Sequence, residues 1–519
     1  MRLICAALLF FLSWVGPAMA QDVVLTSRDG KVSIAGTLLS FDGEFYRLKS
    51  AYGAMTLEKT AVSCAGTGCP DLENYVAEIT LAGARAIGQQ LMPALLADFA
   101  RQSGFELRQI IRDDLHFSYE LRSPDAGKPV ARFHFALSNT ADGFARLIKG
   151  EANMVLASRA VTDKEIIAAR KAGLGHLREA RRQRIVGLDA VVALVAPNNP
   201  LGAISQADLA RLFAGEISNW QQIGGPNAPV YLHLPAASLG IAQRFQQDVM
   251  EANQLELAAD IARHQDAAAL ADTVAADPFA IGISRLSEIG NAKILRFRSD
   301  CGIGLQASAR SVKTEDYPLT APLFLYLPAY RLPKIGREFL SYLQDPSAQH
   351  VVRAAGFVDQ RVEEIALTDQ GARFAHAIAA AGPETDLAEL QRMVTRLQTG
   401  KRLSLTFRFQ PGSSRLDAQS KANVVLLARL LEAGRYDGRE LLFVGFSDGK
   451  GPAKVNRKIA QKRAAAVRAA VQKAAKTLRP QQLSLQLAAF GEAMPMACDD
   501  SPWGRQVNRR VEVWVKERL

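Results

Sequence analysis

The sequence predicts a multidomain protein of the α/β and α+β classes, and three observations lead to this prediction. The chain has 519 residues, enough for about three domains. Short alternating strands fill residues 21–74, whereas strands alternate with helices over residues 75–360. Residues 401–519 are basic, with 23 Lys and Arg against 10 Asp and Glu, while the rest of the chain has 40 against 42. A partner of this last segment is therefore expected to be anionic or zwitterionic.

The first twenty residues predict export. A positive start at Arg2 precedes an apolar run at 4–15, and Ala-Met-Ala at 18–20 forms a small-x-small cleavage site. We interpret residues 1–20 as a signal peptide, and the alternative is a buried N-terminal helix. Later segments contain no run of 18 uninterrupted apolar residues. The mature protein is therefore expected in an oxidising compartment outside the cytoplasm.

Four cysteines follow the predicted signal peptide. Cys64 and Cys69 bracket Ala-Gly-Thr-Gly, whose two glycines let the backbone bend enough for a disulfide. The sequence leaves open whether Cys301 and Cys498 pair across domains or stay free. The cysteines and histidines lack zinc spacing, and no two histidines lie three to five residues apart. We therefore expect neither a metal site nor a cofactor.

Residues 21–74 are predicted to form a small β-module stapled by that disulfide. Turn pairs such as Asp29-Gly30 and Asp42-Gly43 separate its alternating runs. The five runs lie at residues 23–25, 32–34, 37–39, 45–48 and 55–57. The module shows no catalytic pattern, so we expect a packing or docking role.

The long middle segment is predicted to be an α/β body over residues 75–360. A strand at 75–81 precedes a helix at 87–102, and a nearly continuous apolar strand at 186–195 precedes a helix at 206–213. An uninterrupted apolar strand is typical of burial on both faces. We expect a mostly parallel sheet that binds ligands at the carboxyl ends of its strands.

Three stretches of this body carry a family resemblance. They are Gly-Ala-Arg-Ala-Ile-Gly at 83–88, Gly-Glu-Ala-Asn-Met-Val-Leu-Ala-Ser-Arg at 150–159, and the segment 188–225 with Pro-Asn-Asn-Pro and Phe-Ala-Gly-Glu-Ile-Ser-Asn-Trp. In this order they resemble the phosphate-type substrate-binding proteins of ABC transporters. The resemblance implies a two-lobed periplasmic fold that binds a small anion such as phosphate.

Two departures from that family weaken the expected anion site. Ala84 and Arg85 stand where the family offers hydroxyls, and the loop at 234–241 lacks the family's arginine and places Ile241 at a threonine position. A dehydrated oxyanion needs many fixed donors and a cation. We therefore expect weak phosphate binding, or a retained fold whose ligand is lost or changed. The candidate anion-binding residues are Arg85, Ser158, Arg159 and Ser238.

The chain then passes through a predicted linker to a final α+β domain. Residues 361–400 read as a linker with a helix at 386–398, whose apolar residues form one stripe. The domain at 401–519 is predicted to have the order β-α-β-α-β-β. Its expected strands lie at 403–409, 441–445, 485–490 and 511–515, and its helices at 422–433 and 454–476.

The final domain carries the most specific motifs of the chain. They are Gly-Phe-Ser-Asp-Gly-Lys-Gly at 445–451, Asn456, Arg-Ala-Ala-Ala-Val at 463–467, Gly491, Pro495 and the stretch 504–513. With this spacing the whole segment resembles the OmpA-like peptidoglycan-binding domain. Phe446 and Ser447 replace the family's usual His-Thr, and Ala460 stands where serine is common.

The resemblance implies that this domain binds the diaminopimelate of a peptidoglycan stem peptide. That residue presents an ammonium and a carboxylate on one carbon. Asp448 can accept the ammonium and Arg463 can fork onto the carboxylate. Asn456 lies seven residues before Arg463, within roughly 20° on one helix face. Arg509 is expected to buttress the site, or Arg510 does so instead. The alternative is a structural Asp–Arg pair inside the fold.

Other activities fit the sequence less well. Gly-Phe-Ser-Asp-Gly at 445–449 matches a hydrolase nucleophile pattern, yet the last histidine, His376, precedes Ser447. Walker spacing is absent, and export argues against nucleic acid as a partner. The sequence thus predicts a non-enzymatic, peptidoglycan-binding protein of the Gram-negative periplasm, associated with the cell wall or the outer membrane. The alternatives are an ABC-transporter anion receptor tethered to the wall and a wall-active enzyme.

Overall fold

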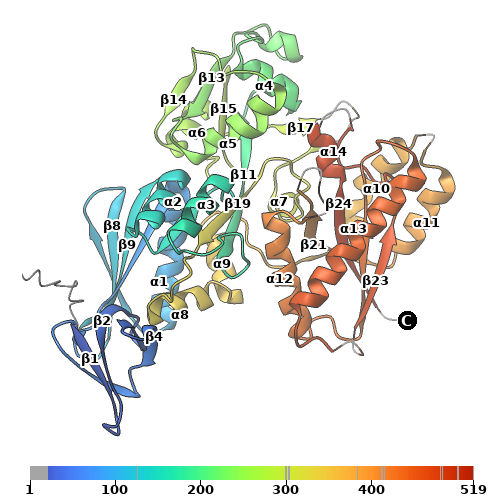
Figure 1. Ribbon diagram of the computed structural model, residues 1–519. Coiled ribbons are helices and arrows are strands. Elements are labelled where there is room, and N and C mark those ends of the chain that lie inside the picture. The colour runs from blue at the N-terminus through green and yellow to red at the C-terminus, as the bar shows by residue number, and fades with distance from the viewer. Residues whose placement is uncertain are drawn as a thin grey trace, which may run out of the picture.

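The structure, a computed structural model, describes residues 22–125, 127–298, 301, 304–382, 384–410, 413, 415–479, 481, 483–499 and 502–517. The expected signal peptide at 1–20 lies outside the described residues. In sequence order the chain forms an N-terminal sheet, a two-lobed body and a C-terminal α+β domain (Figure 1). Within the described ranges, no helix has the length and apolarity needed to span a membrane.

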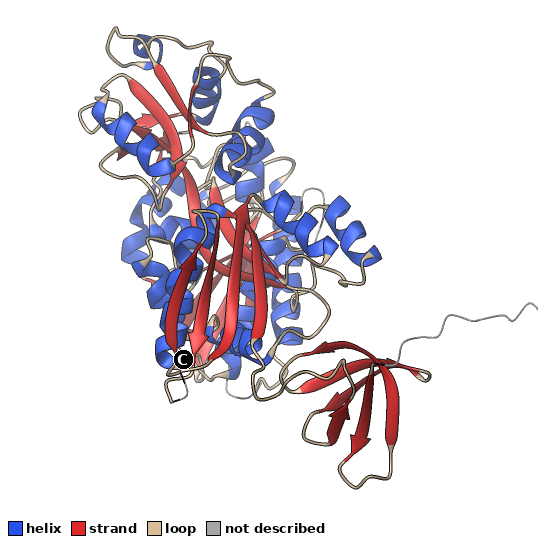
Figure 2. Cartoon of the chain, turned by 90° about the vertical axis from the view of Figure 1, so that its left-hand side faces the viewer, coloured by secondary structure: helices blue, strands red, loops and turns tan. Residues whose placement is uncertain are grey.

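The described N-terminal residues form an antiparallel five-stranded sheet of order β4-β3-β2-β1-β5, set apart from the body in Figure 2. Its strands are β1 (Val23–Ser27), β2 (Ser33–Phe41), β3 (Phe45–Ser50), β4 (Gly53–Glu58) and β5 (Val62–Ala65). The runs expected at 32–34 and 37–39 are one strand, because Gly36 pairs with Ser50 instead of turning the chain. The fifth strand is β5, which no alternating run marked.

The N-terminal sheet has its own small core and a staple. The predicted disulfide between Cys64 and Cys69 is confirmed. Arg331 of the body binds Asp42 and Glu44 at 2.6 and 2.9 Å, which fixes the sheet to the body. The buried apolar residues of the sheet are Val23, Leu25, Tyr46, Leu48 and Val62.

One sheet runs through both lobes of the body in the order β14-β13-β15-β11-β19-β10-β6-β9-β8-β7, with β16 on β11. Its strands are β6 (Ala77–Ala84), β7 (Glu106–Ile111), β8 (His116–Arg122), β9 (Pro129–Ser138), β10 (Met154–Ala157), β11 (Gln183–Val195), β13 (Tyr231–Pro235), β14 (Ala262–His264), β15 (Ala280–Arg285), β16 (Lys293–Ile294) and β19 (Thr320–Tyr326). A small separate sheet holds β12 (Ala203–Ile204), β17 (Arg296–Arg298) and β18 (Gly304–Leu305).

Helices pack on this sheet around two buried clusters of apolar side chains. The expected helices at 87–102 and 206–213 are confirmed, the first as a π-helical turn at Ile87–Leu91 followed by α1. The helices are α1 (Met92–Gln102), α2 (Thr140–Lys149), α3 (Asp163–Lys171), α4 (Gln206–Phe213), α5 (Gly240–Phe245), α6 (Ala267–Ala276), α7 (Ala309–Lys313), α8 (Lys334–Tyr342) and α9 (Pro346–Ala354).

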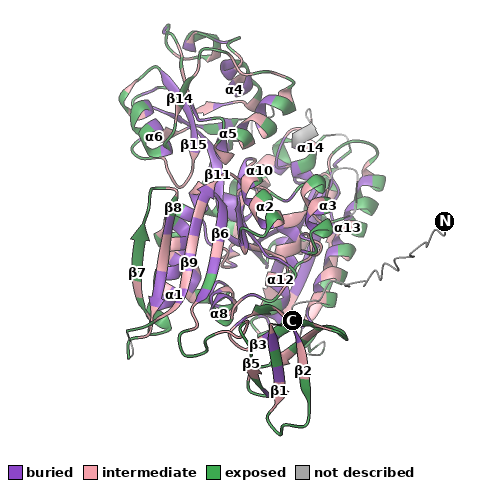
Figure 3. Ribbon diagram, turned by 60° about the vertical axis from the view of Figure 1, so that its left-hand side comes forward, coloured by how far each residue is buried: buried purple, intermediate pink, exposed green. Residues whose placement is uncertain are grey.

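Strand β11 connects the two lobes. Its residues 183–190 pair with β19, and its residues 191–195 pair with β15. It is buried along nearly its whole length, as its apolar run predicts (Figure 3). The expectation of a mostly parallel sheet is wrong, because β11 runs antiparallel to both of these neighbours and β8 runs antiparallel to β7 and β9. Apolar periodicity reports burial but carries no information on strand direction.

The C-terminal domain has a sheet of order β20-β21-β24-β22-β23. The predicted order β-α-β-α-β-β is confirmed from β21 to β24, with α14 added before β24. Helices α12 and α13 cover one face of the sheet, and α10 and α11 cover the other. The segment 361–400, expected as a linker, thus supplies β20, α10 and α11. The elements are β20 (Glu364–Ile365), β21 (Lys401–Arg408), β22 (Arg439–Gly445), β23 (Ser484–Ala489), β24 (Arg510–Glu517), α10 (Gly371–Ala379), α11 (Leu387–Leu397), α12 (Ala418–Glu432), α13 (Ala453–Ala474) and α14 (Pro502–Asn508).

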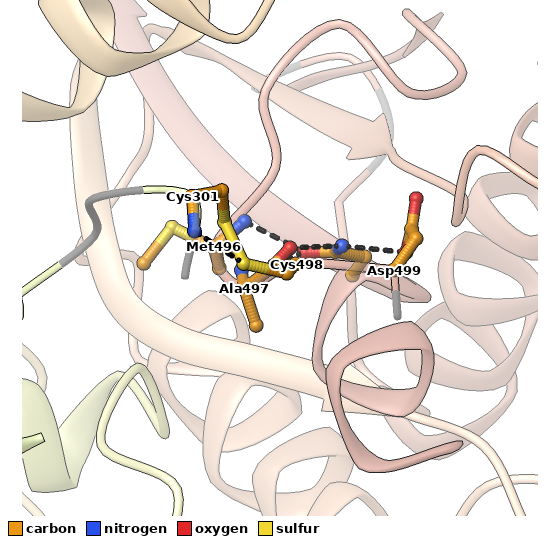
Figure 4. Close-up of a disulfide and its surroundings, with 6 residues drawn as sticks. Cys301, Met496, Ala497, Cys498 and Asp499 are labelled. Atoms are coloured by element: carbon orange, nitrogen blue, oxygen red, sulfur yellow. Dashed lines mark hydrogen bonds between the residues drawn. A yellow bond between two sulfur atoms is a disulfide. The ribbon is translucent and has the colours of Figure 1, made fainter. Parts of the chain in front are cut away.

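A second disulfide joins the body to the C-terminal domain. Cys301 of the body is bonded to Cys498, 197 residues away in sequence (Figure 4). This settles the pairing that the sequence left open. Beside it, Arg408 of β21 donates through Nη2 to the backbone oxygen of Glu315 at 2.7 Å. The two parts are therefore joined both covalently and by polar contacts.

Candidate functional site

Three charged side chains meet at the end of β22. Asp448 lies in the loop after this strand, and Arg509, just before β24, donates through Nη1 to Asp448 Oδ2 at 2.6 Å. Arg463 comes from α13. Burial and then the neighbouring Arg509 lower the pKa of Arg463, while Asp448 opposes the shift. Arg509 thus occupies the carboxylate, and Arg463 lies beyond ion-pair distance of it, which leaves positive charge available for an anionic group of a ligand.

Arg463 is held by packing. Its guanidinium carbon lies 5.5 Å from the centroid of the Phe409 ring, close to the position of a cation–π contact. Among the described residues no carboxylate lies within 4 Å of its nitrogens. Ala464 and Val467, which are close to Arg463 on α13, are fully buried.

Asn456 supports the loop that carries Asp448. It is buried, and its Nδ2 donates to Glu492 Oε2 at 2.7 Å and to the Gly451 oxygen at 3.1 Å. Asp499 accepts the Gly449 amide through Oδ2 at 2.5 Å. Burial and nearby carboxylates raise the pKa of Glu492. Asn456 therefore positions the loop, and Glu492 and Asp499, which no motif marked, add negative charge around it.

The departure at Phe446 has a structural reason, and the neighbouring Gly445 is fixed by the approach of α13. Phe446 is fully buried and stacks against Arg510, whose guanidinium carbon lies 4.3 Å from the ring centroid. It does not reach the rim of the site, and Arg510 faces Glu512 in the interior, at 2.8 Å. A Cβ on Gly445 would lie 2.1 Å from the Ala460 oxygen, so α13 crosses β22 too closely for larger groups.

The body encloses a cleft of about 440 Å³ between its lobes. Arg85, directly after β6, reaches it with a buried Nε that has no hydrogen-bond partner among the described residues. Ser158, after the neighbouring parallel strand β10, places its Oγ 3.2 Å from Thr140 Oγ1. Polar residues of the cleft wall include Arg85, Ser138, Ser158, Asp189, Arg244 and Arg285. Two of the four sequence candidates therefore share this cleft.

The other two candidates do not line the cleft. Arg159 forms a two-pronged ion pair with Glu165, at 3.0 and 2.8 Å, which occupies its guanidinium. Ser238 is exposed in the turn before α5. The described residues also hold no group of three or more His, Cys, Asp and Glu placed for a metal ion.

Comparison with known proteins identifies two domains in the chain. Residues 125–347 match the model of a PBP superfamily domain, and residues 408–509 match the model of the OmpA family. The chain joins a PBP superfamily domain to an OmpA family domain. We call these parts the PBP-like domain and the OmpA-like domain.

The relatives align with the PBP-like domain. Protein SphX of Synechococcus elongatus is 28% identical over 235 residues, which cover 43% of this chain and 67% of that protein. Phosphate-binding protein PstS of Bacillus subtilis is 26% identical over 200 residues, 38% of this chain and 63% of that protein. The chain thus spans about two thirds of the length of these relatives. A solved ABC-type phosphate transport receptor from Vibrio cholerae is 17% identical, covers 54% of this chain and 99% of its own, and has a TM-score of 0.42.

Sequence reasoning missed three residues of the PBP-like cleft. Asp189 is buried and accepts from Ser287 Oγ at 2.7 Å, and burial raises its pKa to about 6 against the opposing charge of Arg285. Arg285 is itself bound to Glu288 at 2.5 Å. Arg244 on α5 donates to a backbone oxygen. Asp189 could have been found as a lone carboxylate in the apolar run 186–195.

The two domains thus present different binding chemistry. In the OmpA-like domain, Asp448, Arg463 and Arg509 offer both signs of charge within one small site. In the PBP-like cleft, Glu288 neutralises Arg285 and Asp189 adds a carboxylate, so little cationic charge is free for an anion. A zwitterion suits the first site, whereas a multiply charged oxyanion suits the second poorly.

Proposed function

We propose that the protein is exported and binds peptidoglycan through its OmpA-like domain without acting as an enzyme. Its place is the periplasm, in contact with the cell wall and, through it, with the outer membrane. The observation that carries the proposal is the grouping of Asp448, Arg463 and Arg509 at the end of β22. This charge pattern complements the ammonium and carboxylate that diaminopimelate bears on one carbon.

Binding exchanges one ion pair for two. In the ligand-free site Arg509 occupies Asp448. An entering ammonium takes over Asp448, and the neighbouring ligand carboxylate then lies between Arg509 and Arg463. Arg463 needs little reordering, because its stacking on Phe409 already holds the guanidinium.

A non-enzymatic role is supported at Ser447, the serine of the hydrolase-like pattern. This residue is buried, and its hydroxyl has no hydrogen-bond partner among the described residues. A nucleophile needs an adjacent base and access to substrate. Ser447 therefore serves as a packed residue of the loop that carries Asp448.

A second function, anion reception by the PBP-like domain, is favoured by one observation. Arg85 brings into the cleft a buried Nε that finds no hydrogen-bond partner in the part of the chain that the structure describes. Relatives of this domain are named phosphate-binding proteins. The neutralised Arg285 and the carboxylate of Asp189 limit the affinity for phosphate, so we place this function second, as a weak receptor tethered to the wall.

Co-sedimentation of the full chain with purified diaminopimelate-type sacculi tests the main proposal. Asp448→Ala and Arg463→Ala should each strongly reduce the bound fraction, because truncating one partner of a charge pair costs about 2–5 kcal/mol. Lys450→Ala, on the exposed part of the same loop, is the matched control and should bind like wild type. Unchanged sedimentation of both single variants, with normal melting, would refute the assignment.

A further inference from the structure

A second large cavity, of about 940 Å³, lies between the PBP-like and OmpA-like domains. One wall comes from residues 178–185 and 343–360 of the body. Residues 361–364, which lead into β20 of the C-terminal sheet, also line the cavity. The other wall is one face of α12 in the OmpA-like domain. Its volume falls in the range of ordinary small-molecule sites. It is distinct from the cleft between the lobes and from the Asp448 site.

Part of the lining is apolar and only half-buried, although Leu426 and Leu430 also pack against the core of the OmpA-like domain. On α12, Val424, Leu427 and Leu431 face the domain core and are buried, whereas Val425 and Leu426 face the cavity and are only half-buried. Apolar side chains contribute from both walls. They include Ile185, Leu343, Val362, Val425, Leu426 and Leu430.

The cavity also carries cations without matching carboxylates. Among the described residues no carboxylate lies within 4 Å of the charged groups of Arg184, Lys421 or Arg429. Arg184 donates through Nη1 to the backbone oxygens of Ala180 and Gln183, while its buried Nε has no hydrogen-bond partner among the described residues. Burial together with Arg429 lowers the pKa of Arg184. Burial followed by the charge of Arg178 lowers the pKa of Lys421. Unpaired cations therefore crowd this space.

The acidic residues of the lining do not cancel this charge. Glu363 is bound to the buried Lys313 at 2.5 Å, and Glu364 is bound to Arg439 at 3.1 Å. On α12, Lys421, Val425 and Arg429 follow at four-residue intervals, so one helix row presents a cation, an apolar group and a second cation. The pattern matches a ligand that carries a negative head beside hydrocarbon.

We propose that this cavity binds a single anionic amphiphile, with a phosphate or carboxylate head on a hydrocarbon chain. The anionic head of the ligand lies among Arg184, Lys421 and Arg429. It accepts charge-assisted hydrogen bonds from them, as a protein carboxylate would. The hydrocarbon chain of the ligand packs along Val425 and Leu426, and their exposed apolar surface is thereby removed from water. The ligand enters as one molecule, because a cavity of about 940 Å³ between two domains has the size of a small-molecule site.

Calorimetric titration of the full chain with dodecyl phosphate, kept below its micelle-forming concentration, tests this proposal. We expect saturable binding of dodecyl phosphate at one site. Dodecyl maltoside and inorganic phosphate should each bind at least about tenfold more weakly than dodecyl phosphate, since each supplies only half of the contacts. The double variant Lys421→Gln/Arg429→Gln should weaken dodecyl phosphate about tenfold or more. Lys473→Gln, an exposed change on α13, should leave it unchanged.

A further variant and a binding measurement with lipid vesicles complete the test. Ala422→Trp adds bulk to the cavity wall and should abolish binding even if the charge variants fold poorly. Equal affinity for dodecyl phosphate and dodecyl maltoside would overturn the proposal, as would unaltered binding by the double variant. Capture by phosphatidylglycerol vesicles without binding of monomeric dodecyl phosphate would point to a membrane surface and would also overturn it.

Discussion

Arg402 of β21 forms a two-pronged ion pair with Asp316 of the PBP-like domain, with nitrogen–oxygen distances of 2.7 and 2.9 Å. The Arg402 side chain is 1% exposed. Asp316 lies just before β19, which pairs with β11, the strand that connects the lobes. The pair therefore fixes the OmpA-like domain to the segment on which the lobes meet.

Removing one partner of this pair should be costly. Arg402→Met leaves Asp316 buried and unpaired, so we expect a loss of about 3–5 kcal/mol in the free energy of unfolding, measured by urea denaturation. The double variant Arg402→Met/Asp316→Leu should recover much of that loss. Arg181→Met, which breaks an exposed pair with Glu179, should change stability by about 1 kcal/mol or less. Equal effects of the two single variants would contradict the account.

The disulfide between the domains should add stability without being required for folding. Cys301→Ser/Cys498→Ser opens a loop of nearly two hundred residues, which should cost roughly 2–4 kcal/mol. The buried Arg402–Asp316 pair should still hold the domains together. The melting temperature measures the loss of stability, and limited proteolysis shows whether the domains stay together. Cleavage between the domains well below the melting temperature would show that the non-covalent interface is insufficient.

Glu315 should make stability fall as pH rises. Burial, followed by the nearby Asp417, raises the pKa of Glu315 from 4.5 to about 8. The folded chain therefore keeps a proton that the unfolded chain releases. The stability from this proton is complete below about pH 4.5 and is lost as pH rises to about 8, with a slope approaching about 1.4 kcal/mol per pH unit.

Glu315→Gln should remove that slope. The variant stays neutral at this position, so the difference in unfolding free energy between variant and wild type should grow in favour of the variant from pH 5 to pH 8. Urea denaturation at several pH values measures it. Glu256→Gln is the same substitution at an exposed position, and its unfolding free energy should change with pH as that of wild type does. If the unfolding free energy of Glu315→Gln also follows wild type, Glu315 does not hold a buried proton.

The cleft of the PBP-like domain should bind phosphate weakly. Calorimetry should give a dissociation constant above about 1 µM, because Glu288 occupies Arg285 and Asp189 repels an anion. Arg85→Gln should remove the remaining binding. Arg159→Gln is the matched control and should retain it, since Glu165 holds that guanidinium outside the cleft. Submicromolar affinity in the wild type would contradict this interpretation.

Local patterns predicted individual elements better than the contacts between them. The strand at 403–409 was visible because alternation reports its own burial, and the Cys64–Cys69 bridge was visible because its loop is short. Arg402 and Asp316 are 86 residues apart, and no local periodicity relates two such charges. The same limit applies to β20, which joins the C-terminal sheet through two residues.

The residues around Asp448 were predicted in part for the same reason. Asp448 and Arg463 lie in two motifs that are close in sequence, whereas Asp499 approaches Gly449 only through the fold. The cleft shows the opposite case. Arg159 stands beside Ser158 in sequence, yet its side chain turns to Glu165. Neighbouring positions therefore do not guarantee a shared site.

Titration of the full chain with a soluble muropeptide tests the central claim most directly. A diaminopimelate stem and a lysine stem differ by one carboxylate, the group assigned to Arg463 and Arg509. We expect the diaminopimelate form to bind and the lysine form to lose about 2–5 kcal/mol. Arg463→Ala should erase this difference between the two ligands, while Lys450→Ala should preserve it. Equal affinity of the wild type for both muropeptides would contradict recognition of the diaminopimelate centre by Asp448 and Arg463.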